Sequence, residues 1–288
     1  MPLAIPGCRA ATVPVRSVLG SDVPAAPTVA IVGGGFSGVM VAAHLLRAAC
    51  ERCAPLRVAL IEKSPGFEGG AAYRTDSSRH VLNVPCARMG AYADDPEHFL
   101  RWLRTRDPDI RGDAYVPRAL YREYLRTVLD EAVAAASGIA TLDWIAGEAA
   151  DVIEAPYAEG ARVVLEDGRA IDASSVVLAI GNLPPGHPGP ADRLRDSAFY
   201  VRDPWRGPPA IERDEPVLLI GTGLTMLDYA LALDERGHRG SIIAVSRHGL
   251  VPEGHADAAR EALPESERQR IVVRSLLAAG VERQSTAR

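Results

Sequence analysis

The sequence predicts a doubly wound α/β fold in two parts, on the basis of three observations. Two short apolar runs, TVAIV at residues 28–32 and VLLI at residues 217–220, each lead into a glycine turn and then into an apolar segment of helical length. Between them, residues 142–182 contain short alternating segments with turn signals at AEG and EDG, which predicts a β-meander. A strand–turn–helix unit on each side of a meander indicates two parallel sheets that carry helices.

Composition and charge limit the function classes. The chain has 288 residues, 47% hydrophobic and 24% charged, which is enough for a full core in two domains or one large α/β domain. A formal net charge of −5 gives no basic face for nucleic-acid phosphates. No apolar run approaches the roughly 20 residues needed to cross a bilayer. We therefore expect a cytoplasmic protein that binds neither nucleic acid nor membranes, with residues 1–27 as a mobile leader.

The first turn, TVAIVGGGFSG, has the GxGxxG spacing of a dinucleotide-binding fingerprint and precedes the helix-forming VMVAAHLLRAA. Gly33 permits the tight turn, Gly35 lets a pyrophosphate approach the backbone, and Gly38 lets the helix lie close to the sheet. The helix N-terminus then attracts phosphates. Glu62 follows RVALI, the next predicted strand, where the fingerprint places an acid that binds a ribose hydroxyl. A plain surface carboxylate is the alternative for Glu62.

Cys50 and Cys53 form a CxxC motif, which suggests either a zinc site or a redox dithiol. No second pair at ligand spacing supplies the other zinc ligands. The motif ends the first predicted helix instead of opening one, so the positive end of a helix dipole is not available to lower a thiol pKa. We therefore predict no metal site and place both cysteines in the loop after the helix.

Two helices are predicted before the meander, from DPEHFLRWLRTR and PRALYREYLRTVLDEAVAAA. Their apolar residues recur at helical spacing, which is more typical of core packing than of a substrate site. Asp94 or Asp95, just before Pro96, is expected to cap the first helix. Histidine is a general candidate for proton transfer, but structural roles are favoured for His80 and His98.

The second turn, VLLIGTGLTMLD, is an incomplete fingerprint because Met226 occupies the third glycine position after Gly221 and Gly223. A methionine there holds the helix farther from the strand. The next predicted strand, SIIAV, ends in Ser246 and Arg247 instead of an acid, and arginine accommodates a 2′-phosphate through charge-assisted bonds. The pattern predicts an NADP site, with a solvent-facing arginine as the alternative.

The order GGGFSG, Glu62, VLAIGN and GTGLTMLD resembles the flavoproteins that bind two dinucleotides. More closely, residues 69–103 and 116–125 resemble the bacterial FAD/NAD(P)-binding family that includes flavin-dependent aspartate N-hydroxylases and a urate hydroxylase; their specific parts are LNVP and PRALYREYL. We expect a Rossmann-like FAD-binding domain with a β-meander and a helical insertion over residues 28–205. A partial Rossmann-like NAD(P)-binding domain with a C-terminal helical tail follows over residues 214–288.

The resemblance also implies which residues hold the cofactors. Tyr73, Asn83 and Met89 would lie near the isoalloxazine ring, and Gly181 near the pyrophosphate. Without the resemblance, Asn83 could be a turn residue, Tyr73 a surface ring and Met89 a core residue. The expected FAD contacts are Gly33, Gly34, Gly35, Phe36, Ser37, Gly38, Glu62, Lys63, Tyr73, Asn83, Met89 and Gly181. The expected NADPH contacts are Gly221, Thr222, Gly223, Ser246 and Arg247.

FAD and NADPH on one chain indicate an oxidoreductase, and the resemblance implies a monooxygenase that hydroxylates a small polar nitrogenous substrate. No catalytic residue is assigned, because the flavin itself carries the chemistry. The alternative is a non-catalytic or truncated nucleotide-binding module, since only about 33 residues follow His255 and they contain no clear buried strand. We therefore expect the chain alone to bind FAD weakly and turn over little, with a completing polypeptide or a homo-oligomer left open.

Overall fold

The computed structural model describes residues 26–64, 66–67, 69–154, 160–187, 193–203 and 211–253. They form two compact units. The first consists of the described residues up to Asp76 together with Val81–Leu183, and the second of Ser77–His80 together with those from Pro184 onward. The expected leader and helical tail lie outside the described residues, except for the short stretches next to the first strand and after the last one.

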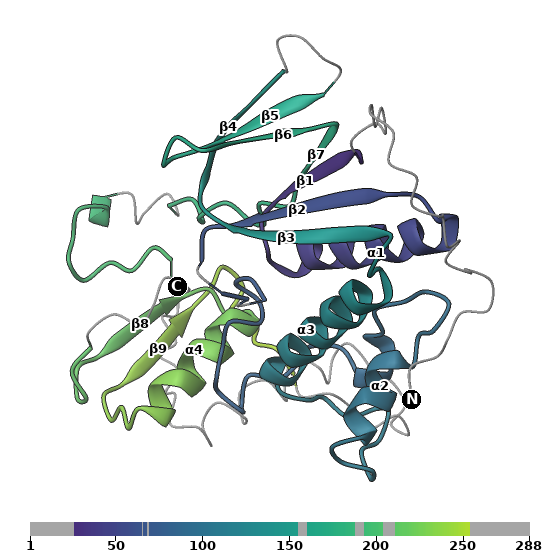
Figure 1. Cartoon of the computed structure of the whole chain (residues 1–288). Helices are drawn as coiled ribbons and strands as arrows, with labels where there is room; N and C mark the ends of the chain where they lie inside the picture. Colours follow the sequence, from purple (N-terminus) through teal and green to yellow (C-terminus); the bar gives the residue numbers. More distant parts are fainter. Residues whose placement is uncertain are drawn as a thin grey trace, which may run out of the picture. The chain divides into compact units, whose positions relative to one another are not determined.

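The first unit is built on a four-stranded parallel sheet in the order β3-β2-β1-β7 (Figure 1). β1 (Thr28–Val32) lies between β2 (Leu56–Glu62) and β7 (Ser175–Leu178), and β3 (Ala140–Ala146) lies beyond β2. α1 (Phe36–Arg52) connects β1 to β2. β1 and β2 are rich in Val, Ile, Leu and Ala because a parallel sheet is covered on both faces. The predicted α/β class is confirmed.

An antiparallel meander covers one face of this sheet. Its strands are β4 (Ala149–Glu154), β5 (Ala161–Leu165) and β6 (Ala170–Ala173). Ala30 and Ile61 of the parallel sheet are buried in the same cluster as side chains of the meander. The alternating segment therefore contains a meander as predicted, but its first and last strands, β3 and β7, belong to the parallel sheet.

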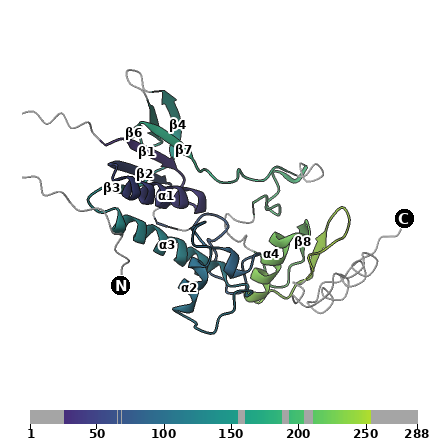
Figure 2. The ribbon, with the colours of Figure 1, turned by 90° about the vertical axis from the view of Figure 1, so that its right-hand side faces the viewer.

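Helices cover the opposite face, as Figure 2 shows from the side. α1 packs against α3 (Arg118–Ala135), and α2 (His98–Arg104) and the short 3-10 helix η1 (Cys86–Arg88) complete this layer. Ile31 and Leu60 point to the helical face, where they share the main core with side chains of all these elements. Neighbouring residues of β1 and β2 thus serve opposite faces, which follows from the twofold period of a strand.

The start of α2 differs from the prediction. The residue that precedes it is Glu97, whose side chain makes no cap. Asp94 pairs instead with Arg47 of α1, and Asp95 pairs with Arg101 of α2 itself. The expectation that either aspartate caps the helix is wrong, because each carboxylate has a guanidinium partner that attracts it more strongly than a backbone N–H does.

The second unit contains a separate two-stranded parallel sheet, formed by β8 (Val217–Ile220) and β9 (Ile242–Val245). α4 (Leu224–Glu235) connects these strands and buries Met226 and Leu233. The second strand–turn–helix–strand unit therefore has the predicted order. None of the helices among the described residues is both long and apolar enough to cross a bilayer.

Candidate functional site

The first glycine turn lies where the strand order of the sheet reverses. β2 and β7 flank β1 on opposite sides, and open parallel sheets bind ligands at the carboxyl ends of strands at such a point. Gly33 follows β1 with φ +108°, and its N–H donates to the Ile61 carbonyl at 2.8 Å. A Cβ at Gly33 would lie 2.2 Å from the carbonyl oxygen of Ala179, just after β7. Only glycine fits at this position.

α1 begins directly after the turn and lies close to it. Gly35 is the residue before the helix, and it leaves the first helical N–H groups uncovered by any side chain of its own. A Cβ at Gly38 would lie 1.8 Å from the Gly33 carbonyl oxygen. The third glycine of the fingerprint is therefore what lets α1 approach the turn, and the open helix end suits a phosphate group.

Glu62 lies against this turn. Its Oε2 accepts a hydrogen bond from the Gly34 N–H at 2.6 Å, and its Oε1 accepts one from the Ser64 N–H at 3.0 Å. The two bonds fix the half-buried carboxylate and leave lone pairs for further donors such as ribose hydroxyls. The neighbouring Lys63 is exposed, with its Nζ 3.7 Å from Glu148 Oε1.

A second pair of glycines, which the sequence analysis did not select, borders the same turn. Gly69 and Gly70 adopt φ of +73° and +76°, where glycine is favoured. A Cβ at Gly70 would lie 3.2 Å from Gly35 Cα. The available signal was the Gly-Gly dipeptide after a strand that ends in Glu62. Gly70 therefore lies against Gly35, whereas Gly69 lies beside Tyr73 and Arg122.

Trp144 of β3 is another neighbour that the sequence analysis missed. A Cβ at Gly34 would lie 2.9 Å from Trp144 Cη2 and 2.9 Å from Glu62 Cβ. The indole packs edge-on against Phe67, with ring centroids 6.4 Å apart. Its buried Nε1 has no hydrogen-bond partner among the described residues. An unpaired buried donor of this kind calls for a further polar group, such as a bound ligand or a water molecule.

The three residues expected near the isoalloxazine ring differ in burial and packing. Tyr73 is half-buried, with its ring centroid 6.1 Å from that of Phe36 and 4.9 Å from that of Tyr121. Burial raises the pKa of the Tyr73 hydroxyl, which keeps it a hydrogen-bond donor near neutral pH. Asn83 is exposed, and Met89 is half-buried and packs against the main core.

Two other expected contacts lie at the edges of the turn. Gly181 has φ +69° and follows the Ala179–Ile180 backbone that packs against Gly33. Ser37 is exposed in the first turn of α1. The structure thus brings the glycine turn, Glu62 and the start of α1 together, with Tyr73 joined to the group through Phe36.

The second turn repeats the backbone geometry of the first. Gly221 has φ +108°, and its N–H donates to the Val245 carbonyl at 2.8 Å. Gly223 precedes α4 with an extended backbone, as Gly35 precedes α1. Apart from its chain neighbours, no described residue has a heavy atom within 4 Å of a Cβ built at Gly221 or Gly223. The second turn is therefore more open than the first.

The loop after β9 carries the other expected residues of this second site. Ser246 Oγ accepts a hydrogen bond from the Gly249 N–H at 3.0 Å, and the Thr222 hydroxyl donates to the Leu250 carbonyl. These bonds tie residues 246–250 to the second glycine turn. Arg247 is exposed in the tied loop, at the carboxyl end of the sheet.

The cysteine motif ends α1 as predicted, but Cys50 lies within the helix and not in the loop after it, because α1 continues to Arg52. Cys53 is exposed and follows the helix with φ +49°, while the half-buried Cys50 thiol donates to the Ala135 carbonyl at 3.4 Å. Within the described ranges, no group of three or more His, Cys, Asp or Glu side chains is placed to hold a metal ion.

The comparisons with known proteins agree with this geometry. Residues 30–183, more than half of the chain, match the model of a family described as FAD-NAD(P)-binding. A curated relative, the nitrosuccinate-forming L-aspartate N-monooxygenase of Streptomyces davaonensis, is 26% identical over 272 residues. That alignment covers 79% of this chain and 42% of the relative, so the chain spans less than half of the relative's length.

Solved structures share the fold. Ornithine hydroxylase from Pseudomonas aeruginosa is similar with a TM-score of 0.53 and 16% identity, over 76% of this chain and 54% of that one. Closed cyclohexanone monooxygenase is similar with a TM-score of 0.51 and 19% identity, over 77% of this chain and 38% of that one. The predicted Rossmann-like architecture is thereby confirmed.

Proposed function

The chain belongs to the FAD-NAD(P)-binding family, and from this membership we propose that it is an FAD-dependent, NADPH-using monooxygenase that hydroxylates a small polar nitrogenous substrate. The observation that carries the proposal is the turn at Gly33–Gly38, with Glu62 hydrogen-bonded to its backbone at the strand-order switch. The curated relative supports the substrate class, because its name states that it acts on the amino group of an amino acid.

The residues around the first turn fit the ADP half of FAD. Gly35 has only ordinary contacts at its Cβ position, 3.5 Å from Gly70 Cα, so the space beside it is available to a pyrophosphate. Glu62 would bind the ribose, and the unpaired Trp144 Nε1 would donate to the nucleotide. FAD, when bound, transfers electrons from NADPH to O₂. The protein's part is to hold the cofactor, keep Tyr73 protonated beside it and limit the access of water.

The second turn would hold NADPH. Backbone N–H groups at Gly221–Gly223 and the start of α4 suit the pyrophosphate. Arg247 would pair with the 2′-phosphate, and Ser246 would help to position the loop that carries it. In this proposal the FAD-binding domain spans residues 28–205 and the NADPH-binding domain begins at residue 214.

The experiment is to purify the chain, release and identify any flavin, and measure NADPH oxidation with and without O₂. A panel of amino acids and other small amines is then tested for faster NADPH oxidation and for hydroxylated product. Gly35→Val is the loss-of-cofactor variant, because its side chain would occupy the pyrophosphate space. Gly66→Ala is the matched control, since among the described residues outside its chain neighbours no atom lies within 4 Å of its Cβ position.

Bound FAD in the wild type and in Gly66→Ala, its loss in Gly35→Val, and an O₂-dependent product from an amine would support the proposal. Flavin binding without NADPH oxidation would favour a non-catalytic nucleotide-binding module. Equal flavin content in all three proteins would refute the assignment of the first turn.

A further inference from the structure

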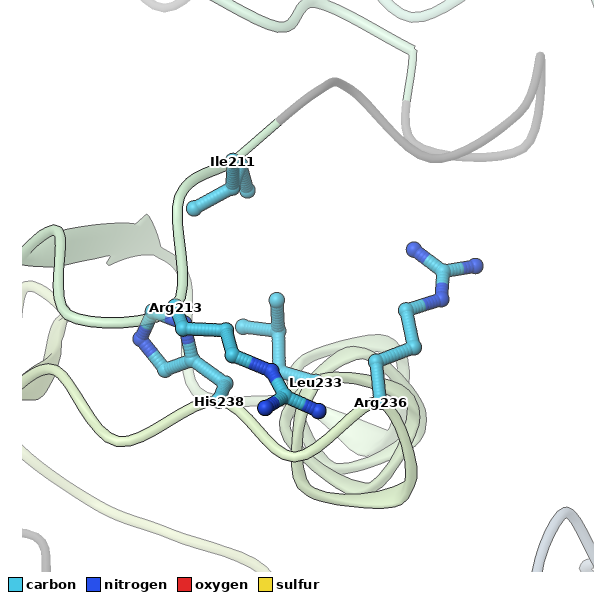
Figure 3. A pocket seen from close by; sticks show the side chains of 5 residues that line it. All are labelled: Ile211, Arg213, Leu233, Arg236 and His238. Carbon is cyan, nitrogen blue, oxygen red and sulfur yellow. The ribbon is translucent and has the colours of Figure 1, made fainter.

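The second unit contains a small pocket at the C-terminal end of α4 (Figure 3). The second glycine turn precedes the other end of this helix. The volume of the pocket is about 50 Å³. Arg213 and Arg236 extend from two different segments of the chain and lie on either side of Leu233, as Figure 3 shows. Three basic side chains and two aliphatic ones line the pocket: Arg213, Arg236, His238, Ile211 and Leu233. No carboxylate is among these lining residues.

Backbone hydrogen bonds fix the walls of this pocket. The Arg213 carbonyl accepts from the Arg239 N–H at 2.6 Å and from the Gly240 N–H at 3.0 Å. Gly237 adopts φ +73°, and a Cβ there would lie 3.2 Å from Arg213 Nη2. The Arg213 guanidinium therefore lies over the Gly237 backbone. Backbone hydrogen bonds alone join the segment that carries Arg213 to the segment that follows α4, so the basic side chains are not needed for this connection.

The basic side chains are not needed as hydrogen-bond donors to the last carbonyl groups of α4. The Leu233 carbonyl accepts from the backbone N–H groups of Arg236 and His238, each at 3.1 Å, and the Asp234 carbonyl accepts from the Gly237 N–H at 2.8 Å. The helix end is thus already capped by backbone donors. The positive charges still interact favourably with the helix dipole, but that effect requires no pocket.

The nearest carboxylates on α4 are engaged elsewhere. Asp234 pairs with Arg79 at 2.5 Å, and Glu235 accepts a hydrogen bond from the Ser77 hydroxyl at 2.7 Å. Neither acid lines the pocket. Within the part of the chain that the structure describes, no ion pair joins Arg213 or Arg236 to an acid, so both exposed guanidinium groups at this pocket are open to a negatively charged ligand.

Two buried polar atoms in this region also lack a partner among the described residues: His238 Nε2 and the Tyr229 hydroxyl. Tyr229 lies one helical turn before Leu233 on the same face of α4. Burial raises the pKa of Tyr229, and the nearby charge of Arg236 opposes this rise. A buried polar atom without a hydrogen bond is costly, and His238 is one of the lining residues, so a missing polar partner is indicated at the pocket independently of the two arginines.

We propose that this pocket binds a small carboxylate of about four or five non-hydrogen atoms, such as propionate. One water molecule needs about 10–15 Å³ on the same scale, which sets this size. The carboxylate would lie between Arg213 and Arg236, which suit it as charge-assisted donors, and the aliphatic end would contact Ile211 and Leu233. The site is separate from the proposed NADPH site, whose Arg247 follows the opposite end of β9.

Equilibrium dialysis of the full chain against labelled propionate, at constant ionic strength, tests the proposal. The variants are Arg213→Gln and Arg236→Gln, and the control is Arg239→Gln, which removes an exposed charge of the same unit outside the pocket. All three changes keep the backbone hydrogen bonds, and circular dichroism checks the fold. Inorganic phosphate and propylamine serve as competitors of different shape and charge.

We expect propionate to bind the wild type and Arg239→Gln alike, and each pocket variant about tenfold or more weakly. Propylamine should not compete, since the site is basic. Absence of binding to the wild type, or equal weakening in Arg239→Gln, would overturn the proposal. It would also fail if phosphate displaced propionate at lower concentration, because the aliphatic wall would then contribute nothing.

Discussion

Within the first turn, single glycines serve two different purposes. At Gly33 and Gly38, a Cβ would collide with backbone carbonyl oxygens at 2.2 Å and 1.8 Å, so these positions are filled by the protein itself. Gly35 has no such neighbour, and its backbone is extended, which any residue can adopt. Gly34, by contrast, is buried against Glu62 and Trp144, so a side chain added there would crowd both of them.

The structure therefore predicts that Gly34→Ala destabilises the fold whereas Gly35→Ala does not. The added methyl at position 34 would lie 2.9 Å from Glu62 Cβ, and overpacking of this kind costs about 1–3 kcal/mol. At position 35 the nearest atom, Gly70 Cα, is 3.5 Å away. Thermal unfolding of the two variants without added nucleotide measures the difference. Equal melting temperatures would show that Glu62 and Trp144 can move aside for the added methyl group at little cost in stability.

Arg247 is expected to select NADPH over NADH. It is exposed in a loop that Ser246 and Thr222 tie to the second turn, where it can reach a 2′-phosphate without displacing protein groups. Arg247→Ala should weaken NADPH binding by roughly ten- to a hundredfold and leave NADH nearly unchanged. Fluorescence titration with both nucleotides provides the measurement. A parallel loss for NADH would instead assign Arg247 a role in the loop itself.

Among the larger elements, α3 anchors the loop that carries Gly69 and Gly70. Arg122 Nη2 donates to Asp76 at 2.8 Å, and its Nη1 lies 3.5 Å from the Tyr73 carbonyl. Arg122→Met should free this loop and reduce FAD retention several-fold, with little loss of helix content, because exposed ion pairs contribute only about 0–1 kcal/mol. Flavin absorbance after gel filtration reports the retention.

The matched control for that variant is Arg126→Met, one turn farther along α3. Arg126 pairs with Asp130 of the same helix at 3.0 Å and makes no described contact with the loop. It should retain FAD like the wild type. If both variants lost FAD equally, the loss would come from a disturbed α3 and not from the broken contact between Arg122 and the loop.

The two glycine units and the helices were predictable because their signals are local. A strand, a glycine and a helix occupy adjacent residues, so the GxGxxG spacing reports backbone conformation directly. The packing of Trp144 on Gly34 joins residues far apart in the sequence, and no periodicity encodes it. The N-terminal cap of α2 was mispredicted for the same reason, because Asp94 forms an ion pair with Arg47, a residue of another helix that is distant in the sequence.

On the scale of the whole molecule, the two units have unequal cores. The first buries a large cluster of side chains that α1, α2, α3 and the parallel sheet share. In the second, Met226 and Leu233 are the buried apolar side chains among the described residues. Its sheet exposes one apolar face, formed by Leu218, Ile220, Ile243 and Val245. Buried apolar area is the main stabilising contribution, so the second unit should open more readily.

Hydrogen exchange followed by mass spectrometry tests this difference and the cofactor assignment together. Peptides from β8, α4 and β9 should exchange faster than peptides from β1, α1 and β2, because their hydrogen bonds are protected by a smaller core. Ligands that bind the folded state stabilise it by mass action, so FAD should slow exchange in α1 and around Glu62, and NADPH should slow it in α4 and β9. Protection of the first unit by NADPH alone would mean that the roles of the two turns are reversed. Identical exchange in both units before any ligand is added would contradict the inequality of their cores.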